Sequence, residues 1–309
     1  MNAPTVPSIE SLIERETSRA LPFAIEAFVA AVREKFGAAA LGIVFYGSCR
    51  RREQTDGLYD LYVVIDRYRR LPAYEAVVGW LLPPNVYHLE VTVAGARRQA
   101  KCTVISLDDF RRGNSRQWFH AYLWGRFCQA VSIAWVRDDA TRAALIDALA
   151  TAVRTFLTRI ACLVAGHADA ETIWVDGLRA SYATELRGEG PDRAVEIYRH
   201  DAPYYEALTR AAAGDVAGLR TRADGTYEVR GDETSEHLAW RIRRVTGKLL
   251  SIVRILKAWT TFHGGLDYLF WKLERHAGRK IEVPQRVRNR PILYVWGFLW
   301  QLYREGVFR

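Results

Sequence analysis

Two short apolar segments, joined by a polar stretch, constrain most strongly how this chain can fold. The first, Leu41–Tyr46, is followed directly by Gly47 and Ser48. The second, Leu58–Asp66, carries Asp60 near its start, and eleven residues separate Ser48 from Asp60. Short apolar runs bounded by turn residues are typical of buried strands. The pattern therefore predicts a strand, a tight turn, and a second strand with a carboxylate near its beginning.

This arrangement suits the binding of a nucleoside triphosphate together with Mg²⁺. Glycine lets backbone N–H groups approach the terminal phosphates closely. A carboxylate on the neighbouring strand can hold Mg²⁺, which neutralises the transferred phosphoryl group and the leaving pyrophosphate. We therefore predict that Gly47, Ser48 and Arg50 bind the nucleotide, with Arg50 contacting phosphate oxygens. Asp60 is predicted to bind the metal and to act in catalysis.

A second metal-binding carboxylate is less easily located. Polymerase-β-like nucleotidyltransferases, which the pattern resembles, carry one two residues after the first, where this chain has Tyr62. Asp66 lies too far along the strand, since six residues span roughly 20 Å. In the segment Val86–Val93 polar and apolar residues alternate, so Glu90 lies on its polar face. Two interpretations stay open: Glu90 completes the metal site on a strand beside Asp60, or it lies on a solvent-facing strand edge.

The remaining pattern predicts the domain organisation. Ala100–Ser106 reads as a fourth strand, and Lys101 near its start is predicted to contact the triphosphate and to act in catalysis. Beyond about residue 140 the apolar spacing is mostly helical. We therefore expect an α/β nucleotidyltransferase domain over residues 1–140 and a mostly helical domain, which binds the acceptor and docks on the membrane, over residues 141–309.

Charge is unevenly distributed along the chain. The net charge of +9 arises in the C-terminal part, where residues 240–309 contain 15 Lys and Arg but 4 Asp and Glu. This excess predicts an anionic partner. The four cysteines lack a C-x-x-C pair, so no disulfide framework or zinc site is expected. No apolar run approaches the roughly 20 residues that a membrane-spanning helix needs.

Several segments, taken in order, resemble the phosphatidate cytidylyltransferases of the translocator assembly and maintenance type, the peripheral CDP-diacylglycerol synthases best known from mitochondria. The Gly-Ser turn and the Asp60 strand are similar to those of the family, which also lacks the second carboxylate two residues on. The further similar segments are Lys101–Ser106, Trp118–Leu123, Gly125 and Arg126, Val131, Ser181–Arg187 and Arg254–Lys257. The resemblance covers about residues 40–280.

The resemblance implies a reaction and a location. The reaction joins CTP and phosphatidate, giving CDP-diacylglycerol and pyrophosphate, with Mg²⁺, in phospholipid biosynthesis. The implied acceptor-binding residues are Arg126, Tyr182, Glu185, Arg187 and Lys257. The implied location is cytoplasmic, peripheral on the inner face of a membrane with an anionic surface. Nucleic acid is not an expected partner, and the sequence does not indicate an oligomeric state.

Two other classes of function stay open. One is a soluble nucleotidyltransferase that acts on a tRNA end, a protein or a small molecule. The other is a degenerate nucleotidyltransferase fold that only binds nucleic acid or anionic lipid. The single carboxylate favours the binding protein, whereas the joint presence of Gly47, Ser48, Asp60 and Lys101 favours catalysis.

The segment Pro291–Trp300 bears on the expected location. It contains two tryptophans and a tyrosine, no charge, and arginines on either side. Ten residues cannot span a bilayer, but Trp and Tyr favour the headgroup boundary and cations attract anionic lipid. The segment is therefore either a membrane-docking element or a buried final helix.

Overall fold

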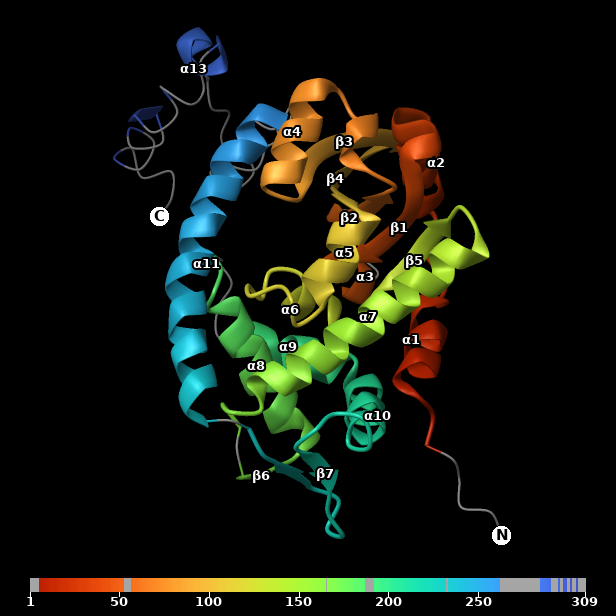
Figure 1. The fold of residues 1–309 in the computed structure, drawn as a ribbon. Coiled ribbons are helices and arrows are strands. Elements are labelled where there is room, and N and C mark those ends of the chain that lie inside the picture. The colour runs from red at the N-terminus through yellow and green to blue at the C-terminus, as the bar shows by residue number, and fades with distance from the viewer. Residues whose placement is uncertain are drawn as a thin grey trace.

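The computed structural model of the chain describes residues 6–52, 57–164, 166–186, 192–231, 233–261 and 284–289, together with residues 294, 297, 298, 301 and 304. In its N-terminal half, helices cover both faces of a five-stranded sheet (Figure 1). The second half is mostly helical and includes a small three-stranded sheet. The predicted α/β fold, followed by a mostly helical part, is confirmed.

The N-terminal half contains all four strands predicted from the sequence and a fifth that was not predicted. Its strands are β1 (Ala40–Tyr46), β2 (Leu58–Ile65), β3 (Asn85–Val93), β4 (Ala96–Ser106) and β5 (Ser132–Val136). Its helices are α1 (Ile9–Thr17), α2 (Ala24–Phe36), α3 (Ser48–Arg52), α4 (Ala73–Leu81), α5 (Leu107–Asn114) and α6 (Trp124–Phe127), with short 3₁₀ turns at Gly37–Ala39 and Tyr68–Arg70.

The strands are ordered β3-β4-β2-β1-β5. β1 is antiparallel to β2 and to β5, whereas β2 and β4 are parallel. β3 and β4 form a hairpin whose two turn residues, Ala94 and Gly95, have φ angles of +49° and +77°. Positive φ at both positions gives the turn a twist that matches the flanking strands. The hairpin places β3 beside β4, and β4 in turn pairs with β2.

Each face of the sheet packs on its own cluster of apolar side chains, because successive residues of a strand point to opposite faces. Leu61 and Val63 of β2 lie on the same side as Phe28 of α2. Tyr62 and Val64 lie on the other side, among side chains of α5, α6 and α7 (Asp139–Ile160). Asp60 shares this second face with Tyr62, two residues further on.

The C-terminal half starts with α7, whose N-terminus is capped by the Asp138 side chain accepting the N–H of Thr141 at 2.7 Å. The other helices are α8 (Ala170–Tyr182), α9 (Arg193–His200), α10 (Ala202–Ala212), α11 (Glu233–Thr261) and α13 (Gln285–Asn289). Strands β6 (Gly166–Ala168), β7 (Leu219–Thr221) and β8 (Tyr227–Val229) form the small sheet, in the order β6-β8-β7.

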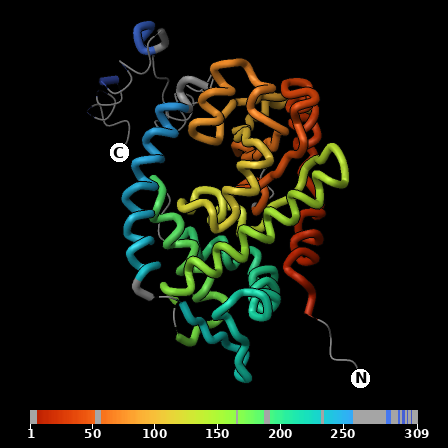
Figure 2. Tube along the Cα trace, viewed as in Figure 1, coloured from red at the N-terminus to blue at the C-terminus, as the bar shows by residue number. Residues whose placement is uncertain are grey.

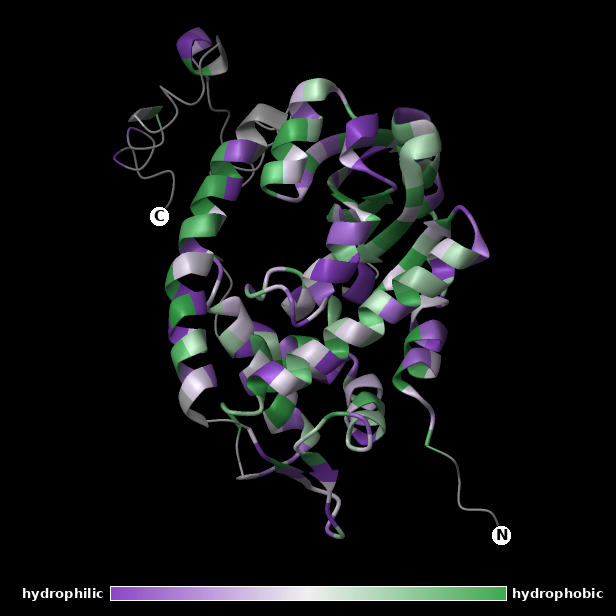
Figure 3. Ribbon diagram, viewed as in Figure 1, coloured by the Kyte–Doolittle hydropathy of each residue, from purple (hydrophilic) through white to green (hydrophobic). Residues whose placement is uncertain are grey.

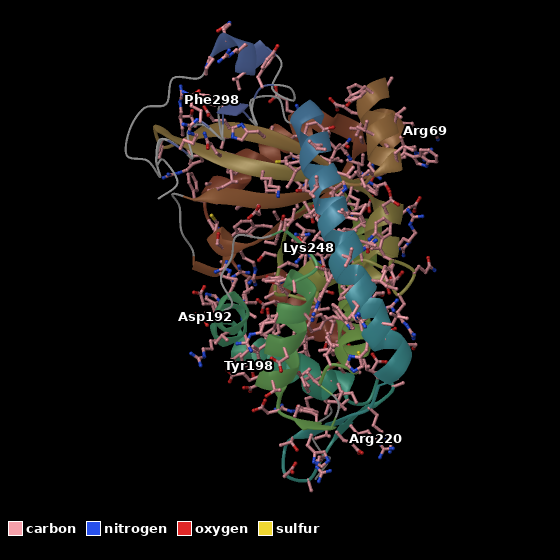
Figure 4. All side chains as sticks on the ribbon, turned by 90° about the vertical axis from the view of Figure 1, so that its left-hand side faces the viewer. Arg69, Asp192, Tyr198, Arg220, Lys248 and Phe298 are labelled. Atoms are coloured by element: carbon pink, nitrogen blue, oxygen red, sulfur yellow. The ribbon has the colours of Figure 1, made fainter. Side chains whose placement is uncertain are left out.

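The long helix α11 links the two halves. In Figures 1 and 2 it runs along one side of the molecule, from the small sheet at one end to α4 at the other. Figure 4, which views the molecule from that side, shows α11 passing in front of the large sheet and of α8. It packs against β3. The helix therefore covers the side of the sheet on which β3 lies.

The two halves share one hydrophobic core. The larger buried cluster joins Val44 and Tyr62 of the sheet to Trp174 of α8 and Tyr205 of α10, through α7. Sheet gives way to helices at about residue 139, close to the expected boundary at residue 140. The division into two domains stays a prediction, since these buried side chains pack together across it.

Within the described residues, none of the helices has both the length and the apolar character needed to cross a bilayer. The outward side of α11 combines apolar with basic residues, as the alternating colours of Figure 3 show. The segment Pro291–Trp300 lies mostly outside the described residues, so the choice between docking element and buried helix stays open.

Candidate active site at the end of strand β2

The turn after β1 lies directly against the Asp60 carboxylate. Tyr46, the last residue of β1, is the register partner of Asp60 on β2. Gly47 follows with φ +88°, and a Cβ added to it would lie 2.6 Å from Oδ2 of Asp60. Since such a contact is too short and the backbone conformation disfavours other residues, only glycine fits here. Gly47, the start of α3 at Ser48, and Asp60 are thus brought together as predicted.

Lys101 lies beside Asp60 in the sheet. The two residues are register partners in the parallel pairing of β2 with β4, so their side chains leave the same face. His88 of β3 is in turn the register partner of Lys101. Burial lowers the pKa of His88, although Glu90 opposes the shift. Asp60, Lys101 and His88 therefore form one row across three strands, and His88 is a member to which the sequence assigned no role.

The expectation that Glu90 lies on a strand beside Asp60 is wrong, because β4 separates β3 from β2. Two strand spacings amount to about 10 Å, whereas a Mg²⁺ ion lies only about 2.1 Å from each of its ligands. Glu90 is opposite Gln99 in the hairpin, is exposed, and forms an ion pair with Arg97 at 3.5 Å. It is an exposed residue of the hairpin, in agreement with the second interpretation above.

The donors around Asp60 limit how Mg²⁺ could bind. Within the part of the chain that the structure describes, no three His, Cys, Asp or Glu side chains are grouped to hold a metal. Mg²⁺ often binds through one or two protein carboxylates, with substrate phosphates and water as its other ligands. Asp60 fits such an ion only in company with a phosphate ligand.

Arg50 is not placed to bind a nucleotide, and that prediction is wrong. Its guanidinium forms a close ion pair with Glu16 of α1, a second with Asp201 at 3.7 Å, and donates to Ser132 Oγ at 3.1 Å. The side chains of Arg50, Glu16 and Asp201 are 6%, 5% and 2% exposed. A buried cation with two buried carboxylate partners has a structural role, joining α1, α3 and the start of α10.

Arg126 and Glu185, both predicted on the acceptor side, are paired with each other. Nη2 of Arg126 lies 3.0 Å from Oε2 of Glu185, and the same guanidinium donates to the carbonyl oxygen of Tyr122 at 2.5 Å. The guanidinium also lies over the Tyr122 ring, 4.4 Å from its centroid. Burial tends to lower the pKa of Arg126, but Glu185 and Tyr62 outweigh it and raise the pKa. Arg126 is therefore a permanent cation close to the face of the sheet that carries Asp60.

The other predicted acceptor residues are dispersed. The hydroxyl of Tyr182, in the last turn of α8, donates to Oε1 of Gln129 at 3.2 Å. Arg187 lies outside the described residues. Lys257 of α11 donates to the carbonyl oxygens of Leu82 and, at 2.9 Å, of Pro84. Burial, together with the nearby Arg254, lowers the pKa of Lys257 to about 7. Lys257 thus binds the backbone just before β3, and this contact gives no support to acceptor binding.

No protein-family model matches the chain, and no curated protein matches it. Among solved structures, the chain is similar to a nucleotidyltransferase-like protein from Exiguobacterium sibiricum 255-15. The two sequences are 12% identical, the match covers 92% of each chain, and the TM-score is 0.25. Because this similarity is low, the function proposed below rests on the residues of the site.

Proposed function

We propose that the chain is a nucleotidyltransferase, which transfers a nucleoside monophosphate from a nucleoside triphosphate to an acceptor. One observation carries the proposal: the Gly47 backbone abuts the Asp60 carboxylate, and Lys101 leaves the same face of the sheet beside it. A turn without a side chain gives phosphate oxygens access to the backbone. The lysine supplies a positive charge and the carboxylate a metal ligand, so the three together suit a triphosphate.

In the proposed reaction, an oxygen of the acceptor attacks the α-phosphorus of the nucleotide. A new P–O bond forms as the bond to the β-phosphate breaks, and pyrophosphate leaves. Mg²⁺, held by Asp60 and the phosphates, would supply neutralisation of the charge on the triphosphate. Lys101 binds and orients the phosphate chain, and the turn at Gly47 fixes its position. Positioning and charge neutralisation dominate phosphoryl transfer, so the site needs no covalent nucleophile.

For the substrates, we propose CTP and phosphatidate, which give CDP-diacylglycerol. The resemblance of the segments around Gly47, Asp60 and Lys101 to phosphatidate cytidylyltransferases supports this choice. The phosphate of phosphatidate is ionised near neutral pH, so it can attack without a strong general base. The basic C-terminal part supports attachment to an anionic membrane surface, on its inner face and without a membrane-spanning helix.

Release of pyrophosphate tests the proposal directly. Purified protein is incubated with Mg²⁺ and CTP, ATP, GTP or UTP, in combination with phosphatidate vesicles, tRNA or no acceptor. We expect release only with CTP and phosphatidate vesicles, and formation of CDP-diacylglycerol in the same sample. Release with another nucleotide would retain nucleotidyl transfer and overturn CTP as the substrate, and release with tRNA would overturn the lipid acceptor. If the protein binds nucleotide but releases no pyrophosphate under any of these conditions, we would conclude that it is a binding protein.

Substitution of Gly47 tests the contact that carries the proposal. In Gly47→Ala the new Cβ would meet Asp60 Oδ2, so the carboxylate must move. We expect pyrophosphate release to fall about tenfold, since small displacements of positioning groups are costly in catalysis. Gly95→Ala is a matched control, because Gly95 also has a positive φ (+77°) but an added Cβ there meets nothing within 4 Å. Equal activities of the two variants would contradict the role of the turn.

A further inference from the structure

Helix α11 is fixed at three heights, twice against the helices of the C-terminal half and once against the half that carries the proposed site. Nε1 of Trp240 donates to the carbonyl oxygen of Arg159 at 2.8 Å. At Gly247 the helix passes so close to residue 184 that an added Cβ would lie 2.4 Å from the carbonyl oxygen of Thr184. Lys257 binds the carbonyl oxygens of Leu82 and Pro84. The turns between Gly247 and Lys257 are therefore held beside the sheet, near β3.

Arg254 projects from this part of α11 toward the proposed active site. Its guanidinium carbon lies 3.9 Å from the centroid of the Tyr122 ring. The same ring is also contacted by the guanidinium of Arg126. Within the described part of the chain, Nε of Arg254 is buried without a hydrogen-bond partner, and no acidic side chain forms an ion pair with Arg254. Arg254 thus has donors directed into a partly buried region and no counter-ion there.

Positive charge gathers around Tyr122. Burial alone would raise the pKa of its phenol, but Arg126, Lys101 and Arg254 outweigh burial and lower the pKa. The carboxylate of Glu185, which opposes this effect, is paired with Arg126. Lys101 lies on the sheet and Arg254 on α11, and both lower the pKa of Tyr122, so their charges favour an anion close to this ring.

We propose that Arg254 is a phosphate-binding residue of the active site, and that it binds phosphoryl oxygens together with Lys101. The inference rests on the proposed nucleotidyl transfer. It assigns phosphate binding by α11 to Arg254, whereas the sequence had pointed to Lys257 on the same helix. A guanidinium can donate two parallel hydrogen bonds to a phosphate, and stacking on Tyr122 presents its plane in a fixed orientation. The phosphate belongs either to the nucleotide or to the acceptor, since both substrates carry one.

The test compares Arg254→Gln with Arg244→Gln. Arg244 lies on the same helix and is exposed, so the two variants lose the same charge. Binding of CTP, of inorganic tripolyphosphate and of vesicles containing phosphatidate is measured for each by titration. We expect Arg254→Gln to weaken the binding of at least one of these ligands about tenfold or more. A hydrogen bond to a charged group contributes about 1.5–3 kcal/mol, which corresponds to a loss of affinity of this size. Arg244→Gln is expected to bind all three like the unchanged protein.

The ligand whose binding is weakened shows which phosphate, that of the nucleotide or that of the acceptor, Arg254 contacts. Loss of CTP and tripolyphosphate binding places Arg254 at the nucleotide, and loss of vesicle binding alone places it at the acceptor. If Arg254→Gln lowers the melting temperature, Arg254→Met replaces it, since the methionine side chain retains apolar contact with the Tyr122 ring. A folded Arg254 variant that binds all three ligands like Arg244→Gln overturns the inference. Failure of the unchanged protein to bind both CTP and tripolyphosphate would instead overturn the proposed function.

Discussion

Asp60→Asn is expected to reduce pyrophosphate release at least ~10²-fold, the usual loss when a group that stabilises charge in the transition state is removed. Asparagine has the same size, so the contact with Gly47 and the pairing of β2 with β1 and β4 stay intact. Only the negative charge that would bind Mg²⁺ is lost. The measurement is a steady-state release assay at several Mg²⁺ concentrations, with the melting temperature as a check on folding.

Asp66→Asn supplies the matched control. Asp66 follows the other end of β2 and pairs with the exposed Arg70 at 3.2 Å, so the same chemical change occurs far from the turn. Activity near that of the unchanged protein is expected for this variant. If Asp60→Asn retained the activity of Asp66→Asn, Asp60 would not be the metal-binding residue.

Arg50→Ala is expected to lower the free energy of unfolding by about 3 kcal/mol, because it leaves two buried carboxylates without their main cation. Glu16 and Asp201 are 5% and 2% exposed, and Arg19, which is exposed, would replace Arg50 only in part. Chemical denaturation monitored by tryptophan fluorescence gives the free energy.

Arg142→Ala is the control, because it also removes an arginine that pairs with α1. Comparing the free energies of unfolding of the two variants shows how much of the loss comes from the burial of the Arg50 ion pairs. Arg142 pairs with another residue of α1, Glu14, at 2.9 Å, but the two side chains are 30% and 55% exposed, far more than those around Arg50. Such pairs contribute about 1 kcal/mol or less. Similar destabilisation in the two variants would contradict a structural role for Arg50. A selective loss of nucleotide binding by a fully stable Arg50→Ala protein would return Arg50 to the nucleotide site.

The sequence predicted those parts of the fold that local patterns determine. Apolar runs with turn residues on either side located β1, β2, β3 and β4 to within a few residues. Strand β5 was missed because it is only five residues long and lies within a stretch whose overall spacing is helical. The order of the strands was also missed. It depends on the parallel pairing of β2 with β4, two segments that are distant in the sequence, which puts β4 between β2 and β3.

Local patterns in the sequence also predicted part of the candidate site. Gly47 and Ser48 follow β1, Asp60 lies near the start of β2, and Lys101 pairs with it from β4, so their spacing along the chain was informative. The contacts of Arg50 with Asp201 and of Lys257 with Pro84 were not foreseen, because these partners are more than a hundred residues away in the sequence. Tyr122 and Arg254 meet across a similar separation, and no local pattern marks such a pair.

The core shared across residue 140 bears on how the protein can be divided. Residues Val44 and Tyr62 of the sheet are covered by α7, so a fragment that ends before Asp139 would expose apolar surface to water. The complementary fragment would lose the same contacts, and both would be prone to aggregate on their own. Produced together in one cell, the fragments could recover the missing surface by associating. The chain is thus suited to a split-protein reporter, in which activity signals that the two pieces have met.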